Sequence, residues 1–98
     1  MTADQTSEKA AATAAEIAEG LLRFLEEKTK TAAQPDQDLF ASGLVSSMFA
    51  MELVVFLERS YGVMIIGSDL KLDNFRTVQA MTRLVLRLRD SGGMTADA

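Results

Sequence analysis

The sequence predicts an all-α domain with three longer helices and one short helix. Apolar side chains recur at helical spacing within residues 7–28 and again within residues 77–90. Between these segments, residues 48–57 are almost continuously apolar and are bounded by serines and by a glycine. Residues 62–67 would suit a β-strand, but no second strand is evident to pair with them. A length of 98 residues allows one such domain with its own core.

The first predicted helix spans residues 7–28, which are rich in alanine and glutamate. Its apolar positions follow i, i+4, i+7, i+8 spacing and should face the core: Ile17, Leu21, Phe24 and Leu25. Residues 1–6 are polar, and we expect them to be disordered. The folded domain is therefore predicted to cover residues 7–90, followed by a disordered tail over 91–98.

A long connection over residues 29–46 follows the first helix. It contains the chain's one proline, Pro35, and two aspartates, Asp36 and Asp38, which we interpret as turn formers rather than as a cation site. Connections of this length are often functional. Four apolar residues should hold it against the core: Leu39, Phe40, Leu44 and Val45.

The second helix is predicted from its boundaries and its composition. Ser46 and Ser47 are suited to cap its start, and Gly62 is suited to end it. Nine of the ten residues from 48 to 57 are apolar, and a small domain can seldom bury such a helix on every side. On a helical wheel, one stripe should meet the core, namely Ala50, Leu53, Val54, Leu57 and Tyr61, and we assign Phe56 to the core as well. The opposite side is predicted to contact a partner: Met48, Met51, Glu52 and Val55, with Phe49 at its edge and Ser46 at its start.

After Gly62, residues 62–67 are interpreted as a loop anchored in the core, and residues 68–74 as the short helix. Thr77 is predicted to cap the last helix, which should end near Asp90 at the Ser-Gly-Gly that follows.

The composition excludes several kinds of chemistry. The chain has no cysteine and no histidine, so it lacks a thiol, the usual general base and the commonest metal ligand. A hydrolase built on a Ser/His or Cys/His pair is excluded, and no metal site is expected. The net charge of −4 divides into −6 over residues 1–58 (four bases, ten acids) and +2 over residues 59–98 (six bases, four acids). We expect no nucleic-acid or membrane partner, and a cytoplasmic protein.

The start of the second helix is the place where chemistry is most plausible. A helix N-terminus offers unpaired backbone N–H groups and partial positive charge, which favour a phosphate ester. Two serines at such a position also serve as simple caps, and local spacing alone favours that simpler role.

The segment Gly43-Leu44-Val45-Ser46-Ser47-Met48 resembles the Gly-x-Asp-Ser-Leu signature of acyl carrier proteins. Glu52-Leu53-Val54, the helix end from Glu58 to Val63, and Thr77-Val78 are similar to that family as well. The resemblance covers roughly residues 21–85. It departs from the family at Ser46, where an aspartate is usual, and at Phe49, where a polar or acidic residue is common.

The resemblance implies a four-helix acyl-carrier-like bundle without catalytic activity of its own. It implies that a phosphopantetheinyl transferase attaches phosphopantetheine from coenzyme A to Ser47, and that the thiol of this arm carries an acyl group as a thioester. Ser46 keeps the capping hydrogen bond of the usual aspartate but not its negative charge.

The longer strings from Gly43 to Val54 and from Asp69 to Val78 are similar to a narrower group, the discrete carriers of glycerate-derived extender units such as methoxymalonyl in polyketide (antibiotic) biosynthesis. That similarity implies a monomer whose partners are an acyl-loading enzyme, acyl-modifying dehydrogenases and a methyltransferase, and a polyketide synthase acyltransferase. An aminoacyl, peptidyl or other short-acyl carrier is the alternative within the class. An unmodified helical adaptor, binding partners through the second helix, is the alternative outside it.

Overall fold

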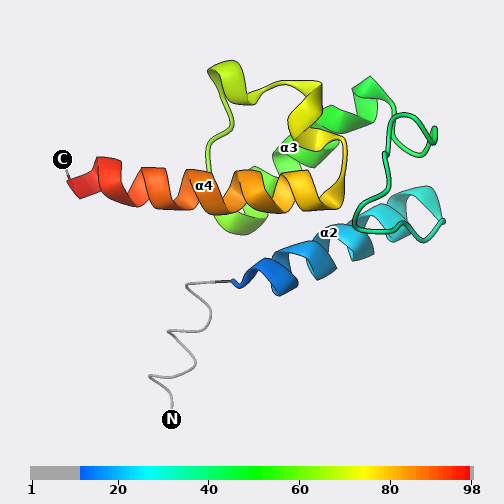
Figure 1. Cartoon of the computed structure of the whole chain (residues 1–98), viewed down its shortest axis with the longest axis horizontal. Helices are drawn as coiled ribbons and strands as arrows, with labels where there is room; N and C mark the ends of the chain where they lie inside the picture. The colour runs from blue at the N-terminus through cyan, green and yellow to red at the C-terminus, as the bar shows by residue number, and fades with distance from the viewer. Residues whose placement is uncertain (1–11, 98) are drawn as a thin grey trace, which may run out of the picture.

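The computed structural model describes residues 12–97, with side chains up to residue 90. Within this range the fold is all-helical, as predicted, and no strand is formed. Helix α2 spans Ala14–Thr29, α3 spans Ser47–Tyr61 and α4 spans Val78–Asp97, while two 3-10 turns, η1 (Gly67–Asp69) and η2 (Leu72–Phe75), lie between α3 and α4 (Figure 1).

Helix α2 begins later than the predicted helix. Thr13 has an extended backbone, its hydroxyl accepts the N–H of Glu16, and the Glu16 carboxylate accepts the N–H of Thr13. This reciprocal capping box defines a helix start at Ala14 rather than at residue 7. The expectations for residues 1–6 and 7–11 lie outside the described residues. The predicted core stripe of this helix is confirmed for Ile17, Leu21 and Leu25, while Phe24 is half-buried.

The short helix expected over residues 68–74 is instead a pair of 3-10 turns. Gly67 adopts a left-handed conformation (φ 63°), and Leu70 leaves the helical region (φ −84°, ψ 73°), so neither turn extends into an α-helix. Asn74 closes the segment by donating a hydrogen bond from its side chain to the Asp69 carbonyl. The short helical turn predicted for this segment is therefore present as two 3-10 turns, and a fourth α-helix is not formed there.

Helix α4 starts as predicted and ends later. Thr77 caps it by accepting the N–H of Ala80 at 2.9 Å. The stop expected after Asp90 is wrong, because α4 continues to Asp97, so the expected tail over 91–98 is helical as far as that residue. A glycine lowers helix stability by about 1 kcal/mol relative to alanine, which weakens a helix without necessarily ending it.

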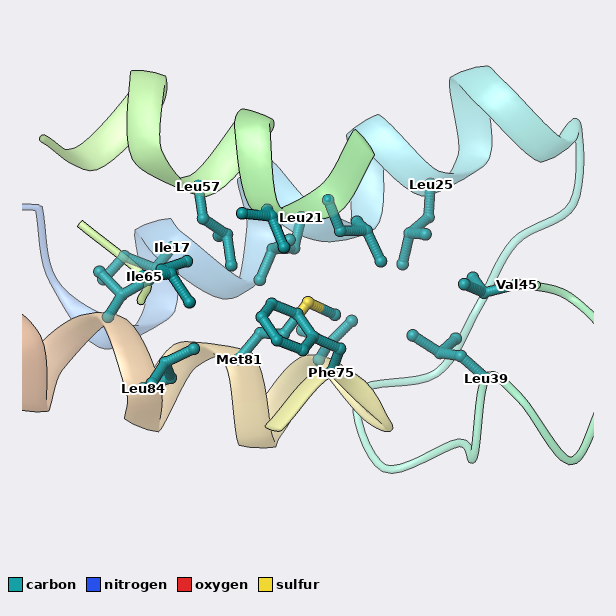
Figure 2. Packing of buried hydrophobic residues seen from close by; sticks show 14 of the residues in the cluster. Ile17, Leu21, Leu25, Leu39, Val45, Leu57, Ile65, Phe75, Met81 and Leu84 are labelled. Atoms are coloured by element: carbon teal, nitrogen blue, oxygen red, sulfur yellow. The ribbon is translucent and has the colours of Figure 1, made fainter. Parts of the chain in front are cut away.

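The core lies where the three helices and the two connections meet. α2, α3 and α4 each contribute one apolar stripe, and side chains from α3 point towards those of α4 in Figure 2. Leu39 and Val45 of the long connection and Phe75 of η2 close one end, with at most 2% of each residue exposed. Two of the four predicted loop anchors, Phe40 and Leu44, are half-buried against this core. None of the described helices is long and apolar enough to cross a membrane.

Gly20 leaves room on α2 for the hydroxyl of Tyr61, the last residue of α3. A Cβ atom at this position would lie 2.7 Å from the Tyr61 hydroxyl oxygen, well inside van der Waals contact. We therefore expect Gly20→Ala to gain less stability than the helix propensity of alanine alone would give, because the Tyr61 side chain must move aside. In a Tyr61→Phe background the obstructing oxygen is absent, and the same change should stabilise by up to about 1 kcal/mol. Chemical denaturation of the four proteins tests this, and equal effects of Gly20→Ala in both backgrounds would refute the contact.

Asp38 fastens the long connection to the start of α4. Its carboxylate accepts the N–H groups of Phe40 (3.1 Å) and Ala41 (2.9 Å) and pairs with Arg76 at 3.3 Å. The Ala41 N–H, with Arg76 and Phe40 adding to its effect, lowers the pKa of Asp38 below its ordinary value. The turn-forming role predicted for this aspartate is confirmed.

The lowered pKa of Asp38 predicts a specific acid sensitivity. The carboxylate contributes stability above its unfolded pKa of about 3.9 and loses that contribution as pH falls through the lower folded value. Asp38→Asn should therefore destabilise at neutral pH, and the gap from wild type should narrow below about pH 4. Urea denaturation across this range measures it. Asp36→Asn is the matched control, since this carboxylate accepts none of the hydrogen bonds formed among the described residues, and a gap that stays constant with pH would contradict the assignment.

Candidate functional site

The two serines at the start of α3 have different structural roles. Ser46 is extended (φ −93°, ψ 166°), and its hydroxyl accepts the N–H of Phe49 at 3.1 Å. Its carbonyl accepts the N–H of Ala50 at 3.0 Å, the first hydrogen bond of the helix. Ser47 is the first helical residue, and its exposed hydroxyl takes part in none of the hydrogen bonds formed among the described residues. The Ser46 hydroxyl therefore has a structural role as the helix cap, whereas the Ser47 hydroxyl has none among the described residues.

The surroundings of Ser47 favour an anionic ester. The N–H groups at the beginning of a helix have no intrahelical acceptor, and the helix dipole adds partial positive charge there. The first turn of α3 holds no acidic residue that would oppose a phosphate. The hydroxyl thus stands at an end of the helix that stabilises negative charge, and it is open to solvent.

An apolar groove of about 320 Å³ begins at Ser47 and runs between α3 and the η1–η2 segment. We call it the Ser47 groove. Ala50, Met51 and Val54 form its wall on α3. The opposite wall comes from the segment between α3 and α4, with Leu70, Lys71, Leu72 and Phe75.

A second groove, of about 660 Å³, lies on the other side of the exposed face of α3, against α2. We call it the α2–α3 groove. Its floor is the stacked pair Phe24–Phe56, whose ring centroids are 4.3 Å apart. Lys28 lies over the Phe24 ring, 5.7 Å from its centroid. Met51 and Val55 line this groove as well, so Met51 separates the two grooves.

The structure brings most of the predicted partner-contacting residues to one outward surface. Met48, Met51 and Val55 are 80%, 57% and 47% exposed, and Ser46 and Glu52 are exposed too. Phe49 is half-buried, stacked on Phe24 with 6.1 Å between ring centroids. The wheel assignment of α3 is thus confirmed for exposure, while contact with a partner stays a prediction.

The opposite stripe of α3 is buried as predicted at Ala50, Leu53, Val54 and Leu57. Tyr61 is half-buried, and so is Phe56, which we assigned to the core. Phe56 instead divides its surface between the core edge and the α2–α3 groove, where its ring stacks on Phe24 of α2.

The residues that complete the two grooves from other elements were not predicted from the sequence. Leu70 and Leu72 are 46% and 48% exposed beside Ser47, and Lys71 lies between them. The sequence feature that could have indicated them is Leu70-Lys71-Leu72, in which two leucines alternate with a lysine within a predicted helical turn. Phe24 and Lys28 stand at i, i+4 on α2. This spacing predicts that the two side chains are neighbours, but it does not predict that they face α3.

Among the described residues, no cluster of acidic side chains is suited to hold a metal ion. Arg87 of α4 is paired with Asp69 at 3.0 Å, and Arg89 donates to the Ala12 carbonyl, so these cations have partners within the fold.

No protein-family model matches the chain, and no curated protein sequence matches it either.

Proposed function

We propose that this protein is an acyl carrier, which holds an acyl group on a phosphopantetheine arm attached to Ser47. The observation that carries the proposal is that the two serines at the start of α3 have different structural roles. Ser46 caps the helix, and the neighbouring Ser47 hydroxyl is exposed, forms no hydrogen bond among the described residues and is located at the positive end of the helix.

The residues around Ser47 fit such an arm. Its phosphodiester is an anion and suits the unpaired N–H groups of the first turn. Its largely uncharged remainder suits the Ser47 groove, which is lined mainly by apolar side chains and begins at the attachment residue. When attached, the arm supplies the thiol that the sequence lacks, and an acyl group is carried there as a thioester.

Attachment requires little from this chain beyond an accessible hydroxyl. The Ser47 oxygen attacks the phosphorus that bears pantetheine in coenzyme A, and a new P–O bond forms as 3′,5′-ADP leaves. The hydroxyl proton passes to a base of the phosphopantetheinyl transferase, because the chain has no histidine and no other base lies within hydrogen-bonding distance of Ser47 in the described structure. The protein acts as a substrate of the transferase and has no catalytic step of its own.

The exposed face of α3 is suited to successive contacts with partner enzymes. Met48, Met51 and Val55 are adaptable or small apolar side chains next to the attachment residue. This surface is the proposed contact for the transferase, an acyl-loading enzyme, acyl-modifying dehydrogenases and a methyltransferase, and a polyketide synthase acyltransferase.

The test is intact mass spectrometry after incubation with coenzyme A and a broad-specificity transferase. We expect a gain of one phosphopantetheine group per chain. An unmodified helical adaptor is the competing function, favoured by the exposed apolar side chains of α3. It predicts no gain with any competent transferase and a face buried in an oligomer, so mass and sedimentation together separate the two.

For the cargo we propose a glycerate-derived extender unit of the methoxymalonyl type, on the similarity of the strings around Ser47 and Asp69–Val78. An aminoacyl, peptidyl or other short acyl group is the alternative. Mass spectrometry of the loaded protein purified from its natural source distinguishes these cargoes directly, since each adds a different mass to the arm.

A further inference from the structure

The two grooves beside the exposed face of α3 carry a charge opposite to that of the whole chain. Three cations line them, Lys28 and Arg59 in the α2–α3 groove and Lys71 in the Ser47 groove, against one acid, Glu52. The full sequence has a net charge of −4. The surface next to the attachment residue is therefore locally basic on an acidic protein.

These cations are not neutralised within the described fold, although Lys28 lies over the Phe24 ring. None of the three takes part in an ion pair among the described residues, whereas three other arginine–aspartate contacts lie elsewhere in the fold. Glu58, the other acid of α3, is turned to the far side of the helix, where its carboxylate accepts the N–H of Ile65 at 2.9 Å. It lines neither groove, so it does not offset the positive charge.

The apolar part of the surface defines the second property of the occupant. The stacked rings of Phe24 and Phe56 line the α2–α3 groove together with the exposed side chains of Met51 and Val55, and Lys28 lies over the Phe24 ring. Lys28 and Arg59 lie at this groove, so a carboxylate next to a buried apolar side chain has a cation within reach. The surface is complementary to an apolar side chain flanked by acidic residues.

We infer that the partner docks on α3 through an acidic, amphipathic protein segment, whose apolar side chains enter the α2–α3 groove while its carboxylates pair with Lys28, Arg59 and Lys71. A second copy of this chain is a poorer occupant, since each copy presents the same cations to the other. The inference depends on the proposed function in one respect only: docking at this surface would bring the partner enzyme to Ser47.

The experiment titrates the ¹⁵N-labelled full chain, as the Ser47→Ala variant, with two synthetic helical peptides. Both carry the same Leu and Phe pair at i, i+4, and the charged positions are glutamate in one and lysine in the other. We expect the glutamate peptide to bind at least about fivefold more tightly and to shift the amide signals of Met51, Val55 and Arg59. Lys28→Glu with Arg59→Glu should reverse the preference. Lys30→Glu with Arg83→Glu, which changes the net charge equally outside both grooves, should keep it.

A preference for the lysine peptide, equal binding of the two peptides, or shifts confined to another surface would overturn the inference. Signals at the grooves that move with protein concentration alone would identify a second copy as the occupant and overturn it too. Because Ser47→Ala cannot be loaded, this result is independent of the mass test. A failed loading with a retained peptide preference refutes the carrier function alone, and the converse refutes the docking chemistry alone.

Discussion

Replacing Ser47 with alanine is expected to abolish phosphopantetheine attachment completely while leaving the fold intact. The hydroxyl is the proposed attacking group, and alanine has none. The hydroxyl is also exposed and makes no hydrogen bond among the described residues, so its removal costs no interaction. Alanine has the highest helix propensity, so stability should stay within about 0.5 kcal/mol of wild type or rise slightly. Intact mass after incubation with coenzyme A and transferase measures loading, and circular dichroism during heating measures stability.

Ser46→Ala is the matched control, because it removes a hydroxyl one residue away with the opposite consequences. It should still be loaded, since Ser47 is untouched. It should be less stable by about 0.5–2 kcal/mol, because the N–H of Phe49 loses its capping acceptor. If instead Ser46→Ala blocked loading and Ser47→Ala did not, the assignment of the two serines would be reversed.

Leu53→Ala is expected to lower the stability of the fold strongly. Leu53 has 0% exposure and belongs to the core formed with α2, α4 and the connections. Removing its buried methyl groups leaves a cavity and should cost about 2–5 kcal/mol. That is a large part of the 5–15 kcal/mol by which small domains are stable, so the midpoint of urea denaturation should fall markedly.

Met48→Ala is the control for this change, on the same helix but facing outward. Met48 is 80% exposed, so its truncation should alter stability by no more than about 0.5 kcal/mol. Loss of stability of the same size in both variants would mean that the inward and outward faces of α3 are assigned wrongly.

The helices were predictable where local rules act on their own. The apolar stripe of Ile17, Leu21 and Leu25 follows helical spacing, and Thr77 is an ordinary N-cap, so both predictions are confirmed. The buried and exposed faces of α3 were also assigned correctly at most positions, because even a strongly apolar helix packs its most regular apolar stripe against the core.

Helix ends were less predictable, because they depend on backbone conformations that several residues select together. Thr13 and Glu16 form a reciprocal cap that residue-by-residue propensity does not anticipate. Leu70 leaves the helical region in the middle of the segment between α3 and α4, which divides it into two 3-10 turns. Neither boundary follows from hydrophobic periodicity, since periodicity reports the face of a helix and not its first or last residue.

The sequence by itself determined that the chain is helical, that it has no thiol or imidazole of its own, and that two adjacent serines precede an unusually apolar helix. These are properties of residue type and spacing along one element. Only the tertiary structure decided which serine is occupied with capping, and it alone revealed the two grooves and their positive charge. The physical reason is that Phe24, Lys28, Leu70 and Lys71 are distant from Ser47 along the chain, and packing of α2 and the η1–η2 segment against α3 brings their side chains to one surface.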